Sequence, residues 1–150
     1  MYVVAFDRDH TVDVNPPANR EAVPLEWVRH LARETDQQVW ATGNQRLTDE
    51  AGIPGVRTAI RRLADEGALP EPVERDLPER WNEEPSVTRF VDRSTRVRLL
   101  ERVHPDATGY LVVDDVNLSH LDGWRHYYPW DFVEAVRSDE LEFDLGLPPR

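Results

Sequence analysis

The chain has 150 residues, of which 39% are hydrophobic, and its 29 acidic and 18 basic residues give a net charge of −11. A chain of this length forms one domain with its own core, and without cysteine it has neither disulfides nor thiolate metal ligands. The negative charge argues against nucleic acid and anionic membranes as partners, and no apolar run approaches the roughly 20 residues of a membrane-spanning helix.

All 18 basic residues are arginine, and the chain contains no lysine. An acidic excess without lysine is typical of proteins from salt-loving archaea, in which high salt screens the repulsion between like charges. We therefore interpret the protein as halophilic; an acidic protein from a high-GC bacterium is the alternative. The N-terminus lacks a basic region followed by a hydrophobic one, so the expected compartment is the cytoplasm.

Four short runs rich in β-forming residues are predicted as strands, at residues 2–7, 38–42, 88–91 and 110–115. Three of them are nearly continuous in apolar residues, which is typical of strands that are covered on both faces. Helical patterns lie between the runs. This alternation predicts an α/β fold: a three-layer, Rossmann-like domain with a mostly parallel central sheet and helices on both faces.

Three stretches between these runs repeat apolar residues at helical spacing, around Leu31, Ile60 and Leu100. A last helix is expected from about residue 131 to 141. The aromatic stretch 124–130, WRHYYPW, is interpreted as core packing of a final strand and helix. An aromatic rim or a dimer contact is the alternative for this stretch.

The segment 67–85 interrupts the alternation, because it contains four prolines among many acidic residues. We expect an irregular connection there, longer than ordinary loops. The sequence leaves open whether this segment is a lid over a site or a solvated crossover. The whole chain, residues 1–150, is expected to be a single domain.

Acidic and hydroxyl side chains occur where three of the predicted strands end. Asp7 and Asp9 belong to the first, Thr42 to the second, and Asp114 and Asp115 to the last. Ligands of open α/β sheets bind outside the carboxyl ends of the strands, so we expect these side chains to converge. Two unit charges 4 Å apart repel by roughly 4 kcal/mol at an effective dielectric constant of 20. The cluster therefore needs a proton or a cation, and its oxygen ligands favour Mg²⁺.

Four motifs, in this order, resemble the haloacid dehalogenase (HAD) superfamily. They are FDRDHT at residues 6–11, WATGN at 40–44, an arginine near the start of the helix at 93–103, and LVVDD at 111–115. The resemblance covers most of the chain. It implies a phosphomonoester hydrolase that acts on a phosphorylated substrate, requires Mg²⁺ and forms an aspartyl-phosphate.

By this resemblance, Asp7 is the nucleophile that attacks phosphorus. Asp9 is the general acid for the leaving alcohol and then the base for the hydrolytic water. Thr42, with the backbone amides after it, holds the phosphoryl oxygens. The family's basic residue is often lysine; here Arg93 takes its place as the phosphate clamp, with Arg96 as the alternative.

The resemblance also assigns the metal site. Asp115 completes the Mg²⁺ shell together with Asp7 and the carbonyl oxygen of Asp9, and Asp114 supports it. The remaining motif residues are expected to bind substrate: His10, Thr11, Gly43 and Asn44.

Members of the family commonly carry a cap domain, but the intervals between these motifs are short for a large one. The chain therefore resembles a minimally capped member. In the family, that arrangement suggests a large substrate or a lid from a neighbouring subunit. The second alternative implies a homo-oligomer.

Two other functions remain open from the sequence. One is a HAD-like binding or regulatory module without turnover. The other is a receiver-type phosphoacceptor domain, which the order of the motifs disfavours, because no middle run supplies the phosphorylated aspartate. A zinc cluster of His120, Asp122 and His126 is also disfavoured, because the spacing lacks a tight helical motif and no cysteine assists.

Overall fold

The structure is a computed structural model, and it describes residues 1–8, 11–12, 21–43, 45–141 and 145–148. Within these ranges a four-stranded sheet has the order β2-β1-β3-β4, and every neighbouring pair is parallel. The strands are β1 (Tyr2–Phe6), β2 (Gln38–Ala41), β3 (Gly109–Val113) and β4 (Trp124–Tyr127). The predicted α/β class with a parallel central sheet is confirmed.

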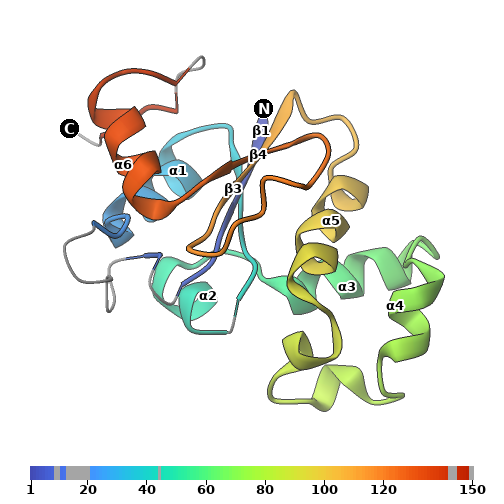
Figure 1. Ribbon diagram of the computed structural model, residues 1–150. Coiled ribbons are helices and arrows are strands. Elements are labelled where there is room, and N and C mark those ends of the chain that lie inside the picture. The colour runs from blue at the N-terminus through green and yellow to red at the C-terminus, as the bar shows by residue number, and fades with distance from the viewer. Residues whose placement is uncertain (9–10, 13–20, 44, 142–144, 149–150) are drawn as a thin grey trace.

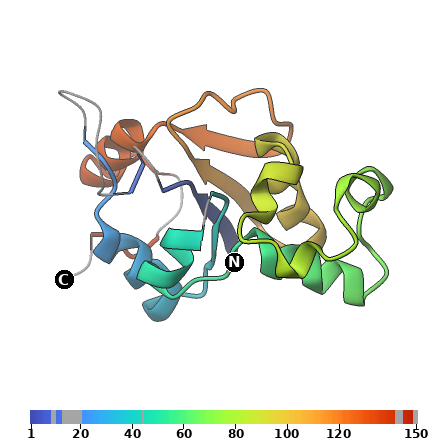
Figure 2. The same ribbon diagram turned by 90° about the horizontal axis from the view of Figure 1, so that it is seen from below.

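Helices cover both faces of the sheet, with α1 and α6 on one side and α3 and α5 on the other (Figure 1, Figure 2). The α-helices are α1 (Leu25–Glu34), α2 (Gln45–Ala51), α3 (Val56–Asp65), α4 (Glu71–Asp76), α5 (Arg93–Val103) and α6 (Pro129–Arg137). The predicted three layers are therefore present. Among the helices of the described residues, none combines the length and the apolar character needed to cross a bilayer.

The alternation of side chains along β1 explains why both faces carry helices. Val4 and Phe6 are buried in a cluster with residues of α1, α2 and α6, whereas Val3 and Ala5 are buried with residues of α3 and α5. Successive side chains of a strand point to opposite faces, so a strand that is apolar throughout needs cover on both sides.

The strand predicted at 88–91 is wrong: this segment forms the 3₁₀ helix η2 (Val87–Phe90). Val87 and Val91 are buried, whereas Arg89 between them is exposed. In a strand, Arg89 would share one face with the two valines, so its exposure between them fits a helical turn rather than the two-residue period of a strand. The two valines pack in a cluster with α3 and α5, so η2 completes the layer beside the sheet.

The segment 67–85, expected to be an irregular connection, contains α4 and the 3₁₀ helix η1 (Trp81–Glu83). Pro70 and Pro72 stand at the N-cap and in the first turn of α4, where a fixed φ suits a helix and no backbone N–H is needed. Val73 and Leu77 are buried against residues of α3. The prolines therefore start a helix that packs on the rest of the chain.

Candidate active site

The polar residues after three parallel strands meet at one edge of the sheet. The backbone N–H of Asp7 donates to the oxygen of Val113 at 3.1 Å, and that of Thr42 donates to the oxygen of Phe6 at 3.0 Å. The N–H of Asp114 donates to the oxygen of Tyr127, also at 3.1 Å. These bonds continue the strand ladders by one residue. The register of the sheet therefore places the side chains of Asp7, Thr42 and Asp114 at the same edge.

Three carboxylates come together there. Asp7, Asp114 and Asp115 each offer an oxygen, and these three oxygens lie within 4.8 Å of one another. The side chain of Asp114 is fully buried, whereas those of Asp7 and Asp115 are 13% and 26% exposed. At 4.8 Å two unit charges repel by roughly 3–4 kcal/mol at an effective dielectric constant of 20. The group therefore needs positive charge beside it.

Arg93 supplies part of that charge. Its Nη1 lies 2.6 Å from Asp114 Oδ1, 3.5 Å from Asp7 Oδ2 and 4.0 Å from Asp115 Oδ1. Burial lowers the pKa of Arg93, but the three carboxylates outweigh this effect and raise the pKa above its ordinary value. Of the two candidates for the basic residue, Arg93 is the one that contacts the carboxylates.

The start of α5 puts Arg93 in this place. The Asp92 side chain caps the helix by accepting a hydrogen bond from the N–H of Thr95 at 2.8 Å, so Arg93 is the first helical residue. Arg96 follows one turn later and is partly buried. Burial, followed by the charge of Arg93, lowers the pKa of Arg96. Its Nε is buried without a hydrogen-bond partner among the described residues.

Asp114 is the most buried of the three carboxylates. Burial and then the charge of Asp7 raise its pKa to about 7, against the opposing effects of the Val116 N–H and Arg93. Oδ1 accepts from Val116 at 2.9 Å and from Arg93, whereas Oδ2 is buried and lacks a partner within the described residues. A buried oxygen with no donor, next to two more carboxylates, fits a hard divalent cation such as Mg²⁺.

Gly43 lies against the Asp7 carboxylate. A Cβ on Gly43 would stand 2.5 Å from Asp7 Oδ1, so no larger residue fits without displacing that carboxylate. Next to it, Thr42 is 2% exposed, and its Oγ1 has no partner among the residues that the structure describes. The hydroxyl is therefore available to a ligand at this edge.

Thr11 is also fully buried, and its Oγ1 likewise lacks a partner in the described part of the chain. Its N–H donates to the oxygen of Arg8 at 3.1 Å, so it belongs to the turn that follows β1. Three further predicted site residues, Asp9, His10 and Asn44, lie outside the described residues.

The structure adds an ion pair that the sequence analysis missed. Arg8, only 7% exposed, donates through Nε to Glu50 Oε1 at 2.5 Å and so joins the turn after β1 to α2. This hydrogen bond lowers the pKa of Glu50 below its ordinary value, against the smaller raising effect of burial. The residues are 42 positions apart in the chain, so no local pattern could reveal the pair.

The disfavoured zinc cluster does not form a metal-ligating group within the described residues. A ring nitrogen of His126 hydrogen-bonds the backbone oxygen of Asp114 at 3.0 Å, and one of His120 lies 3.3 Å from Ser94 Oγ. His126 therefore contacts the backbone of the carboxylate group, and His120 contacts the first turn of α5.

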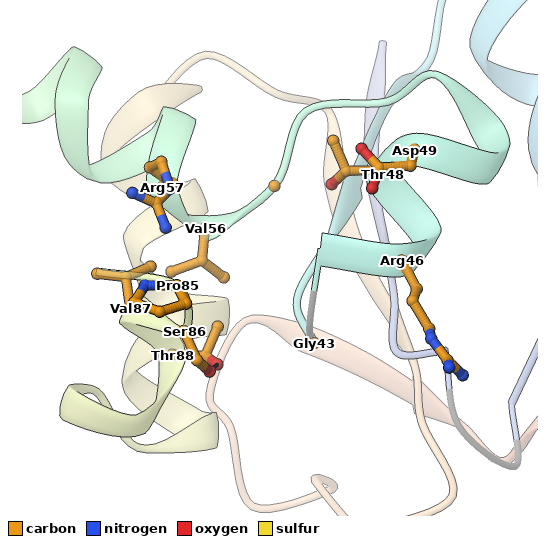
Figure 3. A pocket seen from close by; sticks show the side chains of 11 residues that line it. Gly43, Arg46, Thr48, Asp49, Val56, Arg57, Pro85, Ser86, Val87 and Thr88 are labelled. Carbon is orange, nitrogen blue, oxygen red and sulfur yellow. Dashed lines mark hydrogen bonds between the residues drawn. The ribbon is translucent and has the colours of Figure 1, made fainter. Parts of the chain in front are cut away.

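A pocket of about 310 Å³ adjoins this edge, between α2 on one side and the start of α3 with residues 85–88 on the other (Figure 3). Gly43 belongs both to the pocket and to the wall against Asp7. The sequence did not signal this pocket, because its walls come from segments that meet only in the fold.

Comparisons with protein-family models, curated proteins and solved structures find no match for this chain. The resemblance to the HAD superfamily therefore stands on the four motifs alone.

Proposed function

We propose that this protein is a Mg²⁺-dependent phosphomonoester hydrolase of the HAD type, acting through an aspartyl-phosphate. The observation that carries the proposal is the meeting of Asp7, Asp114 and Asp115 within 4.8 Å, at the edge where three strands end. Arg93 adds a guanidinium to the same group, as phosphoryl transfer requires.

The proposed reaction has two steps on one nucleophile. A carboxylate oxygen of Asp7 forms a bond to phosphorus while the bond from phosphorus to the leaving oxygen breaks, and Asp9 gives its proton to that oxygen. Water then attacks the phosphorus of the aspartyl-phosphate, Asp9 takes the water's proton, and the Asp7 carboxylate leaves. The products are an alcohol and inorganic phosphate. The role of Asp9 rests on the motif.

Arg93 and Thr42 are proposed to bind the phosphoryl group. Arg93 also lies 3.5 Å from Asp7, and this positive charge favours the ionised form that a nucleophile needs. The Thr42 hydroxyl, beside Gly43, has no partner among the described residues and is a donor for a phosphoryl oxygen. Their role is to hold the group in line with Asp7.

Asp7, Asp115 and the backbone of Asp9 would hold the metal ion, with Asp114 in support. When bound, Mg²⁺ would offset the charge of the carboxylates and of the phosphoryl oxygens. The buried Oδ2 of Asp114 supports this assignment, because nothing in the described chain donates to it.

The test is phosphate release from p-nitrophenyl phosphate in concentrated KCl, with Mg²⁺ or with EDTA. We expect turnover only with Mg²⁺ and a loss of at least about 10³-fold in Asp7→Asn, because the nucleophile is removed. Asp122→Asn, an exposed aspartate, is the control and should keep full activity.

Turnover that survives both EDTA and Asp7→Asn would contradict the mechanism. Binding of Mg²⁺ without hydrolysis of any small ester would instead favour the alternative, a HAD-like binding or regulatory module.

A further inference from the structure

The pocket beside the carboxylate group has walls from separate segments of the chain. We call it the α2–α3 pocket and define it by Gly43, Thr48, Val56, Arg57, Ser86 and Thr88. In Figure 3, Gly43 and Thr48 lie on one side, and Arg57, Val56 and residues 85–88 lie across from them. Gly43 borders the Asp7 carboxylate, so a group in this pocket lies next to the proposed nucleophile.

Resting on the proposed hydrolase function, we propose that the α2–α3 pocket binds the leaving group of a compact phosphomonoester that carries a second anionic group, such as a carboxylate. The second anion pairs with Arg57. Hydroxyls of the leaving group meet those of Thr48, Ser86 and Thr88.

The positive charge of Arg57 at the pocket wall favours an anionic ligand. Its two terminal nitrogens donate to the backbone oxygens of Asn82 and Glu84, which fixes the guanidinium at the pocket wall. Within the described residues no carboxylate pairs with it, and two carbonyl oxygens leave its charge unneutralised. Arg46 and Asp49, which also line the pocket, are of opposite sign. The charged side chains of the lining, two arginines and one aspartate, therefore sum to +1 in a chain whose net charge is −11.

The first turn of α3 contributes charge of the same sign. Gly55 is its N-cap and makes no side-chain cap hydrogen bond, and Val56 and Arg57 follow it on the pocket wall. Helix N-termini carry partial positive charge that adds to the field of a nearby guanidinium.

The size of the pocket argues for a small leaving group. A volume of about 310 Å³ is at the low end of the roughly 300–1,000 Å³ of small-molecule sites. Thr48 Oγ1 stands 2.7 Å from where a Cβ of Gly55 would be, so α2 and the start of α3 are in close contact. A leaving group of a few carbons fits this space. The pocket is formed within one chain and needs no wall from a neighbouring subunit.

The polar lining argues for a hydroxylated leaving group. Ser86 Oγ and Thr88 Oγ1 are 3.3 Å apart, and Thr48 adds a third hydroxyl. Each hydroxyl both donates and accepts, so the lining accommodates alcohol groups as well as an anion.

The matched probes are 3-phosphoglycerate and glycerol 3-phosphate, which differ only in a carboxylate against a hydroxymethyl group. We expect kcat/KM at least about tenfold higher for 3-phosphoglycerate, because a charge-assisted contact is gained. Arg57→Gln should lower kcat/KM for 3-phosphoglycerate about tenfold, so that the preference over glycerol 3-phosphate is lost. Arg61→Gln, an exposed arginine on the same helix, is the control and should keep the preference.

A second variant covers the case in which Arg57→Gln unfolds the 82–84 segment. Ser86 is exposed, so Ser86→Asp adds a carboxylate to the pocket wall without disturbing the core. It should lower kcat/KM for 3-phosphoglycerate about tenfold and change that for glycerol 3-phosphate less. Ser138→Asp, at the exposed end of α6, adds the same charge elsewhere and should change neither.

Equilibrium binding of both probes to Asp7→Asn separates this inference from the proposed reaction. Selective binding of 3-phosphoglycerate that is lost in Asp7→Asn/Arg57→Gln supports the pocket assignment even if the wild type releases no phosphate. Measurable turnover of both probes with equal kcat/KM, equal binding of them to Asp7→Asn, or a preference that survives both Arg57→Gln and Ser86→Asp would overturn it.

Discussion

At the scale of single residues, the carboxyl group of Asp114 departs clearly from ordinary acid–base behaviour. Burial and the charge of Asp7 raise its pKa from 3.8 to about 7. Between these two pH values, the carboxyl group is protonated in the folded protein and ionised in the unfolded chain. Its contribution to the free energy of unfolding is therefore complete below about pH 4 and falls as the pH rises through about 7.

Metal-free protein should reveal this effect. In EDTA, we expect the wild type to lose on the order of 2 kcal/mol of stability between pH 5 and pH 8 relative to Asp114→Asn. Urea unfolding at several pH values measures the difference. Asp122→Asn should follow the wild type, and parallel curves for the wild type and Asp114→Asn would refute the raised pKa.

Residue type predicted much of the site, because the chemistry of a carboxylate is visible in the sequence. Asp7, Asp114 and Asp115 follow apolar runs, and the rule that parallel strands end at a common edge brings them together. The choice between Arg93 and Arg96 was not predictable from residue type. Both are arginines one turn apart, and only the position of the Asp92 cap decides which one lies at the carboxylates.

At the scale of elements, the N-cap of α5 positions the cation of the site. Asp92→Ala removes the hydrogen bond to the N–H of Thr95 and should cost about 1 kcal/mol of stability. We also expect kcat to fall, because Arg93 follows the cap directly. Asn caps helices as well as Asp, so Asp92→Asn is the matched control and should keep both stability and kcat. Equal urea midpoints for Asp92→Ala and the wild type would contradict this role.

Helices and strands were predicted where an apolar repeat runs through the whole element, and they were missed where the element is too short to show one. Three strands and the helices α1, α3 and α5 follow from apolar repeats. The last helix, expected at about 131–141 from its start signals, is α6 at Pro129–Arg137, so its predicted end was wrong by four residues. The short helices α2 and α4 carry too few buried residues to stand out from loops. The run at 88–91 was misjudged because a strand needs a hydrogen-bonding neighbour, which propensity does not reveal.

At the scale of the whole molecule, the net charge of −11 governs how stability responds to salt. Repulsion among exposed carboxylates is screened as the Debye length falls from about 10 Å at 0.1 M to about 3 Å at 1 M. We therefore expect the thermal midpoint to rise steadily with KCl from 0.1 to 2 M. Sucrose of equal osmolality is the control for non-ionic effects, and a midpoint that falls over this range would contradict the halophilic interpretation.

The α2–α3 pocket forms only when segments far apart in the chain pack together. Its walls come from Gly43, from α2, from residues 55–57 and from residues 85–88, and the distance between these walls depends on how α2, α3 and η2 pack. The sequence suggested a minimal cap, which in the resembling family goes with a large substrate or with a lid from a neighbouring subunit. The compact substrate that we propose for this pocket rests on its volume of about 310 Å³.

The most direct measurement of the central claim is identification of the phosphorylated residue. Protein quenched in acid during turnover is reduced with borohydride, which converts an aspartyl-phosphate to homoserine, and the peptides are analysed by mass spectrometry. We predict homoserine at Asp7 in the presence of Mg²⁺ and none with EDTA. Turnover with no modified residue, or with the modification at any other aspartate, would contradict the account.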